Sequence, residues 1–179
     1  PSISYVDSGW TACDGGFESG QHCASDLDCG SGSCEEAFNW GPSGQYVTIY
    51  GSDFGTSIGS VYLEDVDSGY IALADTNFPA TCGGDFWHDD SITIKVPEKY
   101  LTGSGSGIFY KTHALYVERP DGQVSNRLDF VIVNDAPGPA LCALDPSAGP
   151  VGTEVTFIGE NFGEADGSIK FYPELVTET

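Results

Sequence analysis

The chain has 179 residues with 27 acidic and only six basic side chains, so its formal net charge at pH 7 is -21. This balance argues against nucleic-acid binding, which needs lysine and arginine to neutralise phosphates, and against electrostatic docking on anionic membranes. No apolar run approaches the roughly 18 residues of a membrane-spanning helix, so we expect no direct membrane insertion.

The remaining composition favours an all-β protein outside the cell. Aromatic residues make up 12% of the chain, more than acidic disordered chains carry, and 24 glycines and 10 prolines supply many turns. Six cysteines beside so few lysines indicate an oxidising, secreted or cell-surface setting. The chain has no methionine, so we expect a processed chain or a fragment of a longer one.

The first predicted strand covers residues 1–7, where Ile3 and Tyr5 alternate with polar positions. The next segment, from about residue 10 to residue 40, is rich in glycine and serine and holds four cysteines. Such a segment buries too little apolar surface to hold a shape without cross-links. We therefore predict a long loop closed by disulfides.

Further strands follow, separated by turns of glycine, proline and aspartate. Alternating apolar residues predict strands at residues 46–50, 60–63, 70–73, 91–96, 114–118 and 128–133. No window shows helical periodicity. Short strands at this spacing predict a β-sandwich.

An internal repeat sets the domain organisation. Residues 44–55 (GQYVTIYGSDFG) align without a gap with residues 152–163 (GTEVTFIGENFG), at an offset of 152 − 44 = 108. Residues 1–7 align instead with residues 139–145, at an offset of 138. The difference, 138 − 108 = 30, means that the first copy carries a 30-residue insertion between its first two strands.

We therefore predict a first domain over residues 1–134, with the Cys-rich insertion at residues 10–40. A linker covers residues 135–138, and the N-terminal part of a second domain covers residues 139–179. The second part has only three expected strands, too few to bury both faces of a sandwich. Either the chain continues, or another subunit supplies the missing strands.

The residue types of the repeated motif have a structural explanation that is independent of any family. In the first copy, Val47 and Ile49 are expected to face the core, and Gly51 to permit a bend or bulge. Phe54 is expected to fold back as an aromatic plug. The second copy carries the same residue types at the corresponding positions, Val155, Phe157, Gly159 and Phe162.

Residues 145–163 (DPSAGPVGTEVTFIGENFG), with residues 91–97, 120–122 and Ser125-Asn126 before Phe130, resemble the IPT/TIG family of immunoglobulin-like domains. The resemblance implies an immunoglobulin-like β-sandwich of TIG type, followed here by a partial second one. Members of this family serve in extracellular receptors, transcription factors, carbohydrate-active enzymes and bacterial surface proteins. The acidic charge argues against the DNA-binding use.

The cysteines allow several pairings, since six cysteines have 15 connectivities. If the four cysteines of the insertion pair among themselves, three arrangements remain there, and Cys82 is left to pair with Cys142. Zinc is the alternative, but the chain has no Cys-x-x-Cys motif. The candidate disulfide residues are Cys13, Cys23, Cys29, Cys34, Cys82 and Cys142.

Calcium is the metal that an acidic surface would bind. Asp65 and Asp67 place alternate carboxylates before a glycine, as the start of a calcium loop does, and Asp26 and Asp28 form a similar pair. Neither segment ends in the bidentate glutamate of an EF-hand. The alternative is that these carboxylates are simply solvated.

The sequence contains few residues that could form an enzyme active site. The only histidines are His22, His88 and His113, and no hydrolase, metalloprotease or phosphate-loop motif occurs. The sequence Trp87-His88-Asp89 hints at a His–carboxylate pair, but no nucleophile accompanies it. Trp10, Trp40, Trp87 and the tyrosine residues could instead stack on sugar rings.

We therefore expect a non-catalytic extracellular structural or adhesive protein built of immunoglobulin-like TIG repeats, forming part of a cell-surface or fibre assembly. Its partners would be other protein subunits or neighbouring repeats of the same protein. The alternative is a carbohydrate-binding accessory domain of a secreted glycoside-active enzyme. Exposed coplanar aromatic side chains in a groove would favour that alternative.

Overall fold

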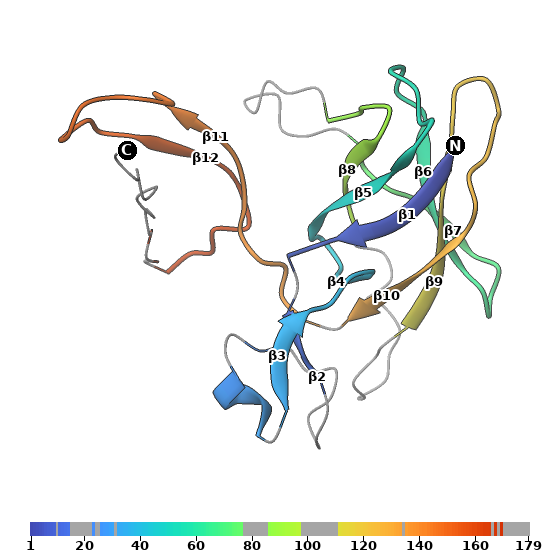
Figure 1. Cartoon of the computed structure of the whole chain (residues 1–179), viewed down its shortest axis with the longest axis horizontal. Helices are drawn as coiled ribbons and strands as arrows, with labels where there is room; N and C mark the ends of the chain where they lie inside the picture. The colour runs from blue at the N-terminus through green and yellow to red at the C-terminus, as the bar shows by residue number, and fades with distance from the viewer. Residues whose placement is uncertain are drawn as a thin grey trace, which may run out of the picture. The chain divides into compact units, whose positions relative to one another are not determined.

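The computed structural model describes residues 1–9, 11–14, 23, 26–30, 32–76, 86–97, 111–133, 135–165, 167 and 169. Within these residues the protein is all-β, as predicted, and its one helical element is the 3-10 turn η1 (Asp26–Cys29). The chain divides into two compact units, Pro1–Pro137 and Gly138–Thr179, which are described separately here (Figure 1). The part of the chain described contains no helix of the length and apolarity that a membrane crossing requires.

The first unit contains a three-stranded and a five-stranded sheet (Figure 1). The smaller sheet is antiparallel, in the order β1 (Ser2–Asp7), β5 (Tyr46–Ser52), β8 (Ser91–Lys95). The larger sheet has the order β4 (Trp40–Pro42), β10 (Leu128–Val133), β9 (Lys111–Glu118), β6 (Ser60–Asp65), β7 (Ile71–Leu73). Among the described strand pairs, β4–β10 alone is parallel.

One hydrophobic core lies between the two sheets. Alternate side chains of β5, β6 and β8 point into it, so the period-2 pattern of these segments sets which face is buried. This arrangement is compatible with a β-sandwich. The core residues of the two sheets include Val47, Ile49, Ile92 and Ile94 from one, and Val61, Leu63, Leu115, Val117 and Phe130 from the other.

The insertion at residues 10–40 differs from the predicted loop. It contains an antiparallel pair, β2 (Thr11–Asp14) and β3 (Ser33–Glu36), as well as the η1 turn. Disulfides join Cys13 to Cys29 and Cys23 to Cys34, and their sulfurs form a small cluster separate from the main core. The loop prediction was wrong because these cross-links bring two polar segments into register, although neither has an apolar face to predict a strand.

The second unit repeats the start of the first. Its two described strands, β11 (Ala140–Asp145) and β12 (Thr156–Glu160), pair antiparallel. Leu141 lies opposite Gly159 just as Ile3 lies opposite Gly51, and the register shifts at the corresponding place in both pairs. The sequence repeat is thus also a structural repeat, including its β-bulge. The third strand expected near residues 167–171 falls largely outside the described residues.

The repeated glycines allow a close approach that no other residue permits. A Cβ on Gly51 would lie 2.0 Å from the carbonyl oxygen of Ser2, and one on Gly159 would lie 1.9 Å from that of Ala140. The phenylalanine three residues later then folds back over each glycine. Phe54 is completely buried, as predicted, whereas Phe162 is 46% exposed, because the described residues of the second unit contribute only two strands.

Candidate interaction surface

The described histidines and Trp87 lie in different environments, two in the core and one at the surface. His113 is fully buried on the core side of β9, and His88 is exposed. Trp87 is 2% exposed, and its indole N–H donates to the carbonyl oxygen of Phe54 at 3.3 Å. Trp87 is therefore a core residue and offers no ring face to a sugar.

Trp40 connects the insertion to the sandwich. It is half-buried and packs with Ala12 of β2 and Val133 of β10. This contact seals the base of the insertion against the larger sheet. Trp10 and His22 lie outside the described residues.

Asp65 has a clear structural role in the turn between β6 and β7. The residue is 5% exposed, and its carboxylate accepts hydrogen bonds from the Asp67 N–H at 3.0 Å and the Ser68 hydroxyl at 2.6 Å. The backbone N–H of Gly69 donates to the carbonyl oxygen of Asp65 at 2.7 Å, which closes the turn. Asp67 is exposed and adds no second carboxylate to this network within the described contacts.

The other predicted calcium pair also supports a turn. Asp26 accepts a hydrogen bond from the backbone N–H of Cys34 at 2.8 Å, and both Asp26 and Asp28 are exposed. In the described part of the chain, no three carboxylates converge as a metal site would need. Calcium at either pair stays a prediction.

The cysteines are engaged in disulfides rather than poised for zinc. The one described group of three potential metal ligands is Cys13, Cys23 and Cys29, and all three sulfurs are already bonded to other sulfurs. A disulfide sulfur is no thiolate ligand, so zinc has no donor set here. Cys142 is also disulfide-bonded, and its predicted partner, Cys82, lies outside the described residues. Disulfide bonding indicates an oxidising environment.

Two groups of aromatic side chains lie on the outer faces of the sheets. On the smaller sheet, Tyr5 stacks on Tyr50 with ring centroids 4.9 Å apart, and Phe38 meets Tyr5 edge-on at 5.4 Å. On the larger sheet, Tyr62 stacks on Tyr116 with centroids 5.1 Å apart. The alternation in residues 1–7 predicted that Ile3 and Tyr5 share the buried face, but the bulge between them turns Tyr5 outward and buries Val6 instead.

A cation accompanies the second aromatic pair. The Arg127 guanidinium lies 4.9 Å from the centre of the Tyr116 ring and pairs with the Glu64 carboxylate. Burial, and then the nearby Glu64 charge, raise the pKa of the Tyr116 phenol. The local charges of Glu64 and Arg127 therefore balance on this face.

Side-chain amides block one edge of the smaller sheet. Asn126 accepts from the backbone N–H of Ile3 at 2.6 Å and donates to its carbonyl oxygen at 3.1 Å. Asn39 does the same for Val6, accepting from its N–H at 2.7 Å and donating a backbone N–H to its carbonyl oxygen at 2.8 Å. The outward main-chain groups of β1 are thus already satisfied.

The edge strands β8 and β4 are also protected against pairing with another strand, whereas β7 is not. The N–H of Thr93 in β8 donates to Phe86, and that of Lys95 donates to Asp75, both at 2.9 Å. β4 is short and ends in Pro42, which has no N–H. The remaining edge belongs to β7, and no described segment pairs with its outer side.

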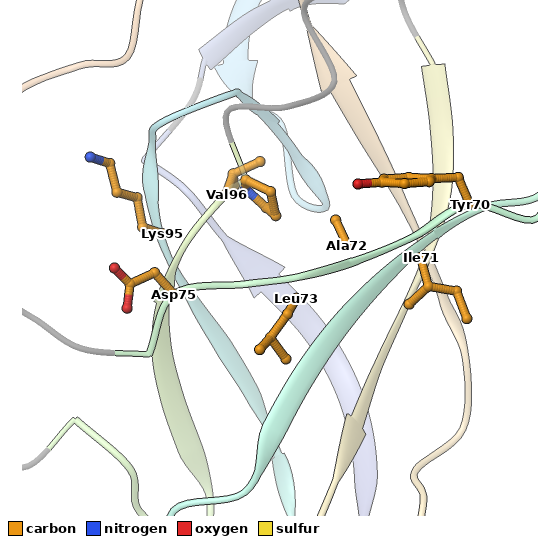
Figure 2. Close-up of a pocket in the computed structure, with 8 residues that line it drawn as sticks. Tyr70, Ile71, Ala72, Leu73, Asp75, Lys95 and Val96 are labelled. Atoms are coloured by element: carbon orange, nitrogen blue, oxygen red, sulfur yellow. The ribbon is translucent and has the colours of Figure 1, made fainter.

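A pocket of about 460 Å³ opens beside the β7 edge, between β7 and β8 (Figure 2). Figure 2 shows Asp75 and Lys95 at one end of this pocket and the Tyr70 ring at the other. Its walls are mainly apolar, and they are completed by Ile71, Ala72, Leu73, Val96 and Pro97. The β7 edge and this pocket form the candidate interaction surface.

Comparison with known proteins does not identify the chain. Neither family models nor curated proteins give a match.

Proposed function

We propose that this chain is a non-catalytic, extracellular structural or adhesive protein built of immunoglobulin-like repeats of TIG type, and that it works by contact with other protein subunits or repeats. The observation that carries the proposal is the structural repeat. Two segments at opposite ends of the chain share one strand register, one bulge and one glycine–phenylalanine contact. Repetition of one module is typical of chains that span distance and present surfaces.

The chemistry of the described surface supports a role without catalysis. Several carboxylates are occupied as acceptors in turns, such as Asp65 in the β6–β7 turn and Asp89, which accepts the Gly55 N–H at 2.8 Å. Two of the three histidines are described, and they lie apart, His113 in the core and His88 on the surface. These two histidines therefore do not act as a pair on one surface.

The exposed apolar side chains of the second unit also support contact with other protein surfaces. Leaving a large apolar side chain in water forfeits roughly 1.5–3 kcal/mol each. Within the described residues these side chains are Leu141, Val151, Phe162 and Ile169. Extracellular placement rests on the disulfides, and the TIG assignment on the motif of residues 145–163.

Carbohydrate binding is the second candidate, and the exposed rings of Tyr5 and Phe38 favour it. Tyr5 and Tyr50 stack on each other, with planes 20° apart, so each ring already uses one face. Such an arrangement leaves less free ring surface than a flat aromatic platform. Protein contact is therefore the better-supported function.

Biolayer interferometry separates the two candidates. The 179-residue chain is immobilised and exposed first to the same chain in solution, then to a panel of soluble glycans. We expect the chain to bind reversibly to itself and to bind none of the glycans. Glycan binding that Tyr5→Ala abolishes, without self-binding, would replace this proposal by the carbohydrate-binding one.

A further inference from the structure

The edge of β7 is built to accept another strand. In the β6–β7 ladder, Ala74 donates its N–H to Val61 at 2.9 Å, and Tyr70 accepts from the N–H of Asp65 at 2.8 Å. Backbone groups alternate in direction along an antiparallel strand, so residues 70, 72 and 74 point toward β6. The N–H and C=O groups of Ile71 and Leu73 therefore point away from the sheet, where no described segment pairs with them.

Apart from its shortness, this edge carries no charged side chain or proline within the described residues 70–74 that would keep another strand away. Natural edges carry charged side chains, prolines, bulges or covering segments. Although the chain has 27 acidic residues, none lies between residues 68 and 74 (SGYIALA). Instead, Tyr70, Ile71 and Leu73 are all about half exposed or more. The β1 edge, with its two asparagine caps, shows that the same domain blocks an edge elsewhere.

We propose that β7 pairs antiparallel with β7 of a second copy of this chain, about a two-fold axis that passes beside Ala72. This inference rests on the proposed function and names the surface through which it acts. In this register Ile71 lies opposite Leu73 of the second copy, and Leu73 opposite Ile71 of the second copy. Each pair exchanges an N–H···O=C bond in both directions, because both residues direct their backbone groups outward.

The side chains suit this register. The small Ala72 residues of the two copies meet at the axis, where strands approach most closely. Leu73 already lies beside Tyr62 on the outer face, so pairing extends one apolar band across both copies. Tyr70 of the second copy falls opposite Ala74, on the side of β7 where the pocket opens, and gives the apolar pocket an aromatic occupant.

Charge restricts where a second copy can meet the chain. Two copies that each carry a net charge of -21 repel one another, so they can approach only at an uncharged patch. Near β7, Glu64 pairs with Arg127, and Asp75 lies opposite Lys95 in an isolated bridge, whereas the adjoining β6–β7 turn adds the acidic Asp65 and Asp67. The main-chain donors and acceptors at two-residue spacing match a polypeptide strand better than a sugar.

Charge-swap variants test the register directly. Ile71→Lys and Leu73→Asp should each weaken self-association at least about tenfold, because each places a charge against an apolar side chain. Mixed together, the two variants should form a heterodimer, since the introduced lysine of one copy then faces the introduced aspartate of the other. Sedimentation velocity is the measurement, at about 1 M salt for each variant alone, and at about 0.15 M salt, where the Debye length is about 8 Å, for the mixture. Val124→Lys, at an exposed site away from β7, is the matched control and should associate as the wild type does.

Amide hydrogen exchange supplies the second readout. The amides of Ile71 and Leu73 should become protected as the wild-type concentration rises. Exchange independent of concentration, or variants that associate like the wild type, would overturn the β7 pairing while leaving the proposed function intact. Protection that appears only when a peptide of residues 91–97 (SITIKVP) is added would assign the edge to a different strand and would also overturn it. A wild type that shows no self-association at all would count against both proposals.

Discussion

Phe54 and Phe162 occupy the same position in two copies of one motif, yet only Phe54 is completely buried. We expect Phe54→Ala to lower the free energy of unfolding of the first unit by about 3–5 kcal/mol, as truncation of a buried phenylalanine does. Phe162→Ala is the matched control and should cost clearly less in the isolated chain. Chemical denaturation of both variants gives the comparison. Equal losses would contradict the difference in burial.

Tyr116 should make the protein sensitive to alkali. Burial and the nearby Glu64 carboxylate raise the pKa of its phenol above the ordinary value of about 10. Below that value, Tyr116 is neutral in the folded and unfolded states alike. As the pH rises past it, the unfolded chain ionises first, so the stability of the folded state falls. Melting temperatures across this range should fall less steeply for Tyr116→Phe, and identical slopes would contradict this expectation.

At the scale of single elements, the β6–β7 turn depends on Asp65. Removing its carboxylate leaves the Asp67 N–H and the Ser68 hydroxyl without their acceptor. We expect Asp65→Ala to lower the free energy of unfolding by about 1–3 kcal/mol, and the exposed control Asp67→Ala to change it little. Thermal melts with calcium and with chelator complete the test. A midpoint that falls on chelation in the wild type, but not in Asp65→Ala, would place a calcium ion in this turn.

The insertion should behave as a separate element held by its disulfides. Its cysteine cluster does not belong to the main core, and its disulfides close segments of 16 and 11 residues. Cross-links over loops of about 15 residues contribute about 3 kcal/mol. Reduction should therefore expose the amides of β2 and β3 to exchange while those of β5 stay protected. Joint loss of protection in all three strands would show that the insertion stabilises the whole unit.

Elements with an apolar face were predictable from the sequence, and those without one were not. The alternation in residues 46–50, 91–96 and 128–133 predicted β5, β8 and β10, because burial of one face determines a strand's register. By contrast, β2 and β3 have little apolar surface, and their cross-links could not be deduced from spacing. The hydrogen bonds from Asn39 and Asn126 to β1 could not be predicted either, because Asn126 contacts Ile3 across 123 residues of sequence.

For the whole molecule, the repeated strand pair and the net charge have opposite effects on self-association. The repeated strand pair and the apolar side chains of the second unit favour contact between protein surfaces. The net charge of -21 opposes contact between identical chains. The balance between these effects depends on ionic strength, because salt screens the charges but leaves apolar contacts in place. Association of this protein should therefore strengthen with salt, unlike association that depends on attraction between opposite charges.

The most direct test of a protein that works through contact with copies of itself is sedimentation of the 179-residue chain. The measurement covers a range of concentrations, at low salt and at about 1 M salt. We expect reversible self-association that increases with both concentration and salt. A compact monomer at every concentration and at both salt levels would contradict this account.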